Sequence, residues 1–354
     1  MAKRFYLHIG NPKTGTSTLQ RAFKENRGYL RKQNILYPEV LAPSNSHAPL
    51  NPYLTTPGNP GHPMWRRVTD NPDELARESQ KSWEHVKAQV ANEDWETLII
   101  SDEMLSGRFF RDTDGQLVPA MKSLYPDVTV VYYIRDVCDQ YLSMAQQLIK
   151  HTPKVPRPNR NRYEKVVTRV REAEFGTLHV RHFDRSAMAG GDILNDFCTA
   201  FLPEIDVDRL SIAKPEANSS LSPEAMALNL EFIRGNCEGF PDPDRQQKLK
   251  FLQSLYKHDR SVEGWARPAL NPAVAAAILT LNTDIAFVAD AFGHDLTGGK
   301  TETCAPEIAE ATFAGIQEIA DICAVDTERQ EALWQVTMPK RDGAKRFWPF
   351  SKRA

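Results

Sequence analysis

The sequence predicts an α/β fold in which a parallel sheet is covered by helices on both faces and is followed by a helical C-terminal subdomain. Three observations lead to this prediction. Short β-rich runs near residues 4–9, 97–101, 128–134 and 177–182 are separated by segments with helical periodicity, as in parallel sheets. A glycine-bounded turn joins the first run to a helix start. Beyond about residue 215 the strand signals fade and helical patterns take over.

This organisation predicts a core at residues 1–215, a helical subdomain at 216–338 that packs on it, and a basic tail at 339–354. Within the subdomain we expect helices over residues 224–236, 243–258, 272–292 and 305–335.

The first element is a buried strand that leads into the turn between Gly10 and Gly15. The two glycines have the spacing of the phosphate-binding motif G-x-x-x-x-G-K-[ST], but Thr16 stands in the lysine position and the lysine comes earlier, as Lys13. Such a turn places backbone N–H groups at a helix N-terminus, where an anion binds well. Hydroxyls and one ammonium group add to it. The hydroxyls belong to Thr14, Thr16, Ser17 and Thr18.

Residues 37–63 are rich in Pro, Asn, Ser and Gly and are expected to form an irregular loop that contributes to a binding site. The next strand, at 97–101, leads into Asp102 and Glu103. Ligands gather at the carboxyl ends of parallel strands, so both carboxylates are placed near the turn.

The run 128–134 is typical of a fully covered parallel strand, and Arg135 follows it directly. Asp136 is a good N-cap for a helix whose apolar residues recur with helical spacing, which puts Ser143 about two turns into that helix. A guanidinium at a strand end suits a phosphate dianion, although a structural ion pair is the alternative.

Both segments resemble sulfotransferases that use 3′-phosphoadenosine 5′-phosphosulfate (PAPS). Residues 12–17 match the family's Pro-Lys-[Thr/Ser/Ala]-Gly-Thr-[Thr/Ser] loop for the 5′-phosphosulfate. Arg135, Asp136, Asp139 and Ser143 match the Arg-Asp-Pro-x-Asp-x-x-x-Ser pattern in which Arg and Ser hold the 3′-phosphate, and Val137 replaces the proline. The resemblance is loose elsewhere in the chain.

The resemblance implies a P-loop enzyme that transfers a sulfuryl group from PAPS to a hydroxyl or amine, with a carbohydrate as the expected acceptor and the nucleotide PAP as product. No metal is expected, because the sequence lacks an acidic strand end of the Walker-B type partnered to a P-loop Lys-Ser/Thr. The residues that it assigns to the donor nucleotide are Lys13, Thr14, Gly15, Thr16, Ser17, Arg135 and Ser143. Lys13 is also expected to neutralise the leaving phosphate.

Two residues compete for the role of general base. A carboxylate at a strand end can take the acceptor's proton when burial raises its pKa, and glycan-modifying relatives commonly use a glutamate, so we favour Glu103. The alternative role for Glu103 is to stabilise a helix N-terminus. The competing base is His47, in the loop 44–48, because many family members use a histidine.

Composition limits the function. The net charge of -2 does not indicate nucleic-acid binding, and the apolar runs are too short to cross a membrane. No signal peptide is visible, and five cysteines without C-x-x-C spacing predict reduced thiols in a cytoplasmic protein. Two basic segments leave alternatives open. The segment 150–162 is either a flap that steers anions or a solvated loop, and the tail is either a frayed end or a contact with an anionic membrane surface.

Two rival functions remain. A P-loop kinase would bind ATP with Mg²⁺, and the displaced Lys13 and the pair of Arg135 and Ser143 argue against it. A non-catalytic module with the same fold would bind a glycan or a protein partner and show no turnover. Neither the acceptor nor the oligomeric state follows from the sequence, because acceptor sites are built from variable loops.

Overall fold

The computed structural model describes residues 2–11, 13–54, 71–111, 115–211, 220–237 and 240–338. The chain divides into two compact units. Unit 1 comprises Met1–Asp136, Asn161–Glu216 and Ala286–Leu296, and unit 2 comprises Val137–Arg160, Ala217–Ile285 and Thr297–Ala354. The segment 137–160 therefore packs with the C-terminal helices although it lies N-terminal to the expected boundary at 215.

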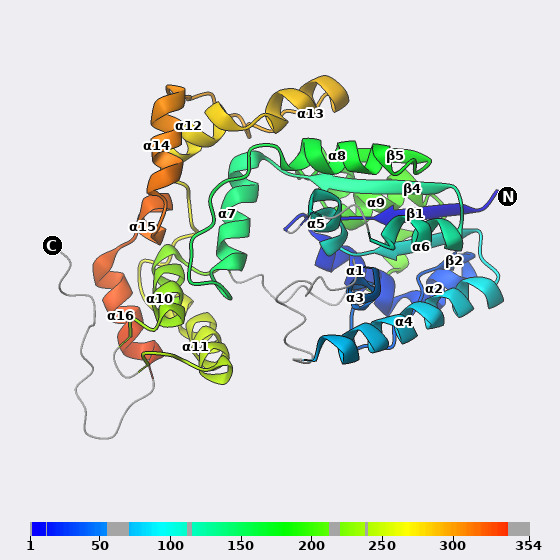
Figure 1. Cartoon of the computed structure of the whole chain (residues 1–354), viewed down its shortest axis with the longest axis horizontal. Coiled ribbons are helices and arrows are strands. Elements are labelled where there is room, and N and C mark those ends of the chain that lie inside the picture. The colour runs from blue at the N-terminus through cyan, green and yellow to red at the C-terminus, as the bar shows by residue number, and fades with distance from the viewer. Residues whose placement is uncertain are drawn as a thin grey trace. The chain divides into compact units, whose positions relative to one another are not determined.

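Unit 1 contains a parallel five-stranded sheet with the strand order β2-β3-β1-β4-β5 (Figure 1). The predicted α/β fold with a parallel sheet is confirmed. The strands are β1 (Arg4–His8), β2 (Ile35–Leu36), β3 (Thr97–Ser101), β4 (Val128–Ile134) and β5 (Thr177–His182). Because β1 lies between β3 and β4, the segments that follow these three strands meet at one edge of the sheet, and those segments carry the predicted site residues.

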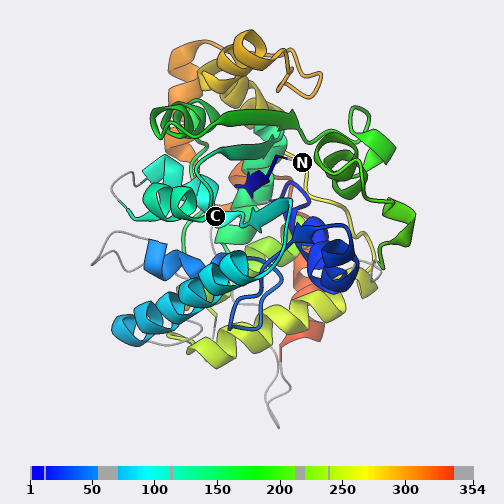
Figure 2. The ribbon, with the colours of Figure 1, turned by 90° about the vertical axis from the view of Figure 1, so that its right-hand side faces the viewer.

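The register brings the strand ends together. His8 pairs with Ser101 on one side and with Val131 on the other, and Ile134 pairs with His182. Strands β1, β3 and β4 are buried on both faces, as their continuous runs of apolar side chains require. Figure 2 shows the sheet from a second direction.

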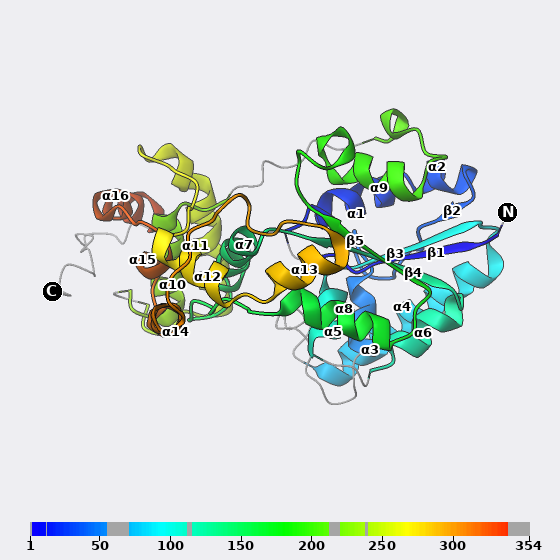
Figure 3. The ribbon, with the colours of Figure 1, turned by 90° about the horizontal axis from the view of Figure 1, so that it is seen from above.

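Helices cover both faces of the sheet (Figure 3). One face packs on α1 (Thr16–Glu25), α2 (Arg27–Lys32) and α9 (Ile193–Phe201), through a core that includes Phe23, Leu30 and Phe197. The opposite face carries α4 (Pro72–Asn92), α5 (Met104–Arg111), α6 (Leu117–Leu124) and α8 (Arg162–Glu172). The remaining elements among the described residues of this unit are η1 (Ala48–Leu50), α3 (Asn51–Leu54), η3 (Ala189–Gly191), η4 (Val207–Arg209) and most of α13 (Asp284–Phe292).

Unit 2 is helical. It consists of α7 (Val137–Leu148), α10 (Pro223–Arg234), α11 (Arg245–His258), η5 (Asp259–Ser261), α12 (Pro272–Leu281), α14 (Pro306–Gly315), α15 (Ile319–Ile322) and α16 (Thr327–Thr337). A buried ionic cluster joins three of these elements. The Arg329 guanidinium lies 2.8 Å from a Glu224 oxygen and 3.0 Å from an Asp259 oxygen, and all three residues are buried. Ser222, two residues before Glu224, accepts the Ala225 N–H as the N-cap of α10, and its hydroxyl donates to Asp259 at 2.7 Å.

Two of the long predicted helices are interrupted. The expected helix 272–292 divides into α12 and α13 because Asn282 and Thr283 donate hydrogen bonds to the backbone carbonyls of Asn159 and Arg160. The expected helix 305–335 divides into α14, α15 and α16, and a capping box of Glu318 and Asp321 restarts the chain at α15. Among the described helices none is by itself long and apolar enough to span a membrane, and α12 and α13 reach that length only when taken together.

Candidate functional site

The turn after β1 exposes a helix N-terminus without a side-chain cap. Helix α1 begins at Thr16, and its N-cap Gly15 has the left-handed conformation (φ 74). A Cβ at Gly15 would lie 2.8 Å from the Phe183 ring, so both the conformation and the space require glycine. Because no side chain caps α1, the first N–H groups of the helix stay available to an anion.

The backbone carbonyl of Asn11 stabilises this turn with two hydrogen bonds. Its carbonyl oxygen accepts the backbone N–H of Thr14 at 3.2 Å and the Thr14 hydroxyl at 2.7 Å. Both polar groups of the buried Thr14 are therefore used within the turn, and the predicted contact of this hydroxyl with a ligand would require it to leave Asn11. Lys13 lies between them in the left-handed region (φ 70), which is uncommon for a residue with a side chain.

Three charged groups converge on this turn from three strand ends. The Arg135 guanidinium, after β4, donates to the Lys13 carbonyl at 3.4 Å. Burial lowers the pKa of Lys13, Glu103 raises it by attraction and Arg135 lowers it by repulsion. The structure thus brings together Lys13, Arg135 and Glu103, as the sequence predicted. Two cations and one partly exposed carboxylate suit a ligand that carries several negative charges.

The two adjacent carboxylates after β3 have different surroundings. Glu103 accepts a hydrogen bond from the Thr16 hydroxyl at 2.7 Å and therefore faces the turn. Asp102 is buried, accepts from the side chain of Asn51 and accepts the Met104 N–H at 2.9 Å. Burial raises the pKa of Asp102 to about 7. Glu103 is the carboxylate that is near Lys13 and open to solvent.

His47 is held inside unit 1 by backbone groups. The Ser101 N–H donates to its Nδ1 at 3.0 Å, and its Nε2 lies 3.0 Å from the Pro38 carbonyl oxygen. Only 2% of its surface is exposed, and burial lowers its pKa to about 4. The one lone pair of the neutral ring is thus already occupied, so His47 would have to break this bond before it could take a proton from an acceptor.

A second buried histidine lies directly under the turn, and the sequence reasoning missed it. His8 ends β1, and its Nδ1 lies 2.8 Å from the Ser101 hydroxyl, which also accepts from Gln20 at 3.2 Å. Burial lowers the pKa of His8 to about 3, so the ring is neutral. This chain of contacts ties the ends of β1 and β3 to α1. The available signal was a polar residue at the end of an otherwise apolar strand.

The sequence reasoning also missed an ion pair at the next strand ends. Nε2 of His182, at the end of β5, lies 2.9 Å from an Asp136 carboxylate oxygen. This contact raises the pKa of His182, and the charges of Asp184 and Asp295 act in the same direction. The His294 ring lies 5.8 Å from the His182 ring.

The other predicted site residues lie in other elements or outside the described residues. Ser143 lies on α7, in unit 2, and its pairing with Arg135 stays a prediction. Of the basic segment 150–162, residues up to Arg160 belong to unit 2, and Arg162 is buried in unit 1 as the first residue of α8. Part of the loop 37–63 and the whole tail 339–354 lie outside the described residues.

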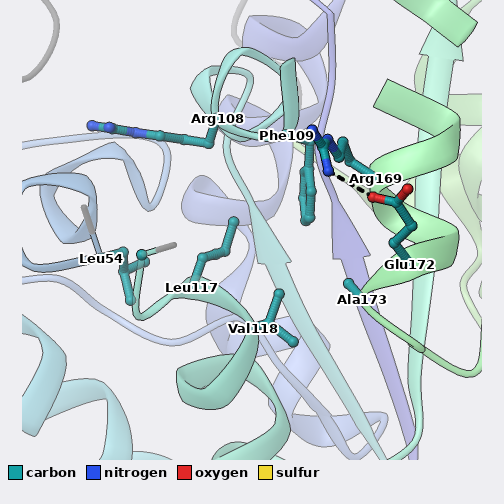
Figure 4. Close-up of a pocket in the computed structure, with 9 residues that line it drawn as sticks. Leu54, Arg108, Phe109, Leu117, Val118, Arg169, Glu172 and Ala173 are labelled. Carbon is teal, nitrogen blue, oxygen red and sulfur yellow. Dashed lines mark hydrogen bonds and ion pairs between the residues drawn. The ribbon is translucent and has the colours of Figure 1, made fainter. Parts of the chain in front are cut away.

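A separate small cavity lies between α3, α5, α6 and α8 (Figure 4). Phe109, Leu117 and Val118 extend into it, and an ion pair between Arg169 and Glu172, with a distance of 2.8 Å, lies along one side. No residue of the turn 10–15 lines this cavity.

Within the described ranges, no group of three or more His, Cys, Asp or Glu residues could hold a metal ion, and none of the five cysteines forms a disulfide. Comparisons with protein-family models, with curated proteins and with solved structures found no match.

Proposed function

We propose that this protein is a PAPS-dependent sulfotransferase that transfers a sulfuryl group to a hydroxyl or amine of an acceptor, with a carbohydrate as the expected acceptor. The observation that carries the proposal is the cluster at the glycine-bounded turn: Lys13 and Arg135 lie together, and Glu103 contacts the same turn through Thr16. Two neighbouring cations fit a donor with a 5′-phosphosulfate and a 3′-phosphate, which the motif resemblance also implies.

Each residue has a role that follows from its chemistry. Glu103 takes the proton of the acceptor hydroxyl as the acceptor oxygen attacks the sulfur. The bond between sulfur and the bridging oxygen breaks, and the leaving nucleotide keeps the electron pair. Lys13 and the free N–H groups at the start of α1 neutralise the charge that develops on this phosphate. Arg135 binds the 3′-phosphate. The reaction requires no metal ion.

The direct test is ligand choice in a thermal-stability measurement. We expect PAP without metal to stabilise the protein, by about 2.7 kcal/mol at ~100 times its dissociation constant. A shift with ATP and Mg²⁺ but none with PAP would instead indicate a P-loop phosphotransferase. Sulfate transfer from labelled PAPS across a glycan panel then separates an enzyme from a non-catalytic module, because the module binds PAP or a glycan without turnover.

A further inference from the structure

A single tyrosine hydroxyl connects the two cationic parts of the site. Tyr163 is buried at the start of α8, and its hydroxyl donates to the Arg135 carbonyl at 2.7 Å. The same oxygen accepts the Arg135 N–H at 3.2 Å and the side-chain amide of Asn11 at 3.4 Å. One donated and two accepted bonds use the full capacity of a hydroxyl. Tyr163 therefore contacts the backbone that carries Arg135 and the residue that closes the turn around Lys13.

The preceding residue holds the other end of the same amide. Nε of Arg162 donates to the side-chain oxygen of Asn11 at 3.1 Å. Its Nη2 lies 3.5 Å from the Ser106 hydroxyl, and its guanidinium faces the Phe110 ring at 5.4 Å. Both ends of the Asn11 side chain are thus held by two consecutive residues of α8, so the plane of this amide is determined.

The position of Asn11 determines the shape of the turn. Its backbone carbonyl accepts both the N–H and the hydroxyl of Thr14. Lys13 lies between these two residues in the left-handed region (φ 70), a conformation that persists only where the surroundings impose it. The side-chain contacts with Arg162 and Tyr163 hold the Asn11 backbone in place. A shift of that backbone would release the constraint on the turn and change the position of Lys13 relative to Arg135.

We propose that Tyr163 is a positioning residue that sets the spacing between Lys13 and Arg135, so that the site selects nucleotides with two separated anionic groups over nucleotides with one. This inference rests on the proposed function, since it takes Lys13 and Arg135 as the two phosphate-binding groups. Preorganisation of both cations by one hydroxyl makes the two contacts cooperative. A bisphosphate gains from the fixed spacing, and a monophosphate that needs only one cation does not.

The test is the Tyr163→Phe variant, which removes one oxygen atom and keeps the ring. The measured quantity is the ratio of the dissociation constants of adenosine 5′-phosphate and PAP, determined by calorimetry. We expect the variant to bind PAP at least ~10-fold more weakly and adenosine 5′-phosphate less than ~3-fold more weakly, so that the ratio falls. Tyr37→Phe is the matched control, because the hydroxyl of the buried Tyr37 also donates to a backbone carbonyl, that of Asn45 at 2.8 Å.

A double variant tests whether Tyr163 acts through Asn11. Asn11→Ala should lower the same ratio. Asn11→Ala combined with Tyr163→Phe should lower it little further, because each substitution removes the same hydrogen bond between Asn11 and Tyr163. If the wild type prefers PAP but Tyr163→Phe lowers only the melting temperature and keeps the ratio, Tyr163 is merely structural and this inference fails alone. If the wild type does not bind PAP, the proposed function fails and the inference fails with it.

Discussion

At the scale of single residues, Lys13 has the most specific environment. It is a lysine in the left-handed region, partly buried, and close to both a cation and a carboxylate. Its charge is most useful when the leaving phosphate becomes more negative. Its contribution should therefore appear in the rate more than in nucleotide affinity.

We predict that Lys13→Ala lowers kcat ~100- to 1000-fold, the range for loss of one preorganised electrostatic group, with a smaller loss of PAP affinity. Transfer from labelled PAPS and PAP calorimetry measure the two effects. Lys32→Ala, at the exposed end of α2, is the control. An unchanged kcat for Lys13→Ala would mean that Lys13 has no role in the transfer step and is only a structural residue of the turn.

The second residue-scale prediction separates the two candidate bases. Glu103→Gln cannot take a proton, so we expect normal PAP binding and a ~100- to 10,000-fold slower transfer. His47→Ala leaves the Ser101 N–H without its acceptor, at about 1–3 kcal/mol, while the Pro38 carbonyl keeps its hydrogen bond from Arg27, so the variant should mainly lower stability. The opposite result, an inactive His47→Ala beside an active Glu103→Gln, would make His47 the base.

At the scale of elements, the junction of β1 and α1 depends on Gly15. Alanine there would keep a positive φ of 74 and would place its Cβ 2.8 Å from Phe183. We predict that Gly15→Ala destabilises the protein by about 1–2 kcal/mol or more and weakens PAP binding. Gly28→Ala is the matched control, because its Cβ meets nothing within 4 Å inside α2, and it should stabilise by roughly 0.5–1 kcal/mol. Chemical denaturation and calorimetry check both variants.

The ends of β4 and β5 are joined by the pair of Asp136 and His182. Because this contact raises the pKa of His182 above 6.5, protonation favours the folded state. The stabilisation should be fully present below pH 6.5 and should be lost as the pH rises through the raised pKa. We therefore expect the stability difference between wild type and His182→Gln to shrink with increasing pH. His151→Gln, at an exposed histidine, is the control. A difference that grows with pH would contradict the assignment.

At the scale of the whole molecule, the two units are stabilised in different ways. Unit 1 has an apolar core between one face of its sheet and α1, α2 and α9, and unit 2 contains the buried cluster of Arg329, Glu224 and Asp259. Removal of the cation from such a cluster leaves two buried carboxylates without their partner. The arginine also donates to the Glu263 carbonyl at 3.1 Å, so its loss affects the backbone as well.

We predict that Arg329→Met lowers the free energy of unfolding by about 3–5 kcal/mol. Arg209→Ala breaks a surface pair with Asp206, whose side chains are 70% and 55% exposed, and should cost no more than about 1 kcal/mol. Denaturant unfolding monitored by circular dichroism compares the two variants. Equal small losses would mean that the buried cluster adds nothing beyond packing.

The sequence alone determined the elements whose signal is local. The bounds of β3, β4 and β5 agree with the predicted runs, and α1 and α7 begin next to the residues predicted to start them. Apolar and β-branched runs form strands between helices in a parallel sheet, and Gly15 can adopt the left-handed conformation that the turn before α1 needs. The approach of Lys13, Arg135 and Glu103 followed from the same logic, because each directly follows a strand or turn of the sheet edge.

Only the tertiary structure decided what each polar side chain contacts. Tyr163 lies 152 residues from Asn11, and His8 lies 93 residues from Ser101, so no periodicity links them. The two-residue strand β2 and the break between α12 and α13 likewise depend on partners distant in the chain. A hydrogen bond forms where the fold brings a donor and an acceptor within reach, and that distance is set by packing rather than by local sequence. For this reason the sequence indicated only a loop histidine at position 47, whereas in the fold the buried His47 ring contacts the backbone of Ser101 and Pro38.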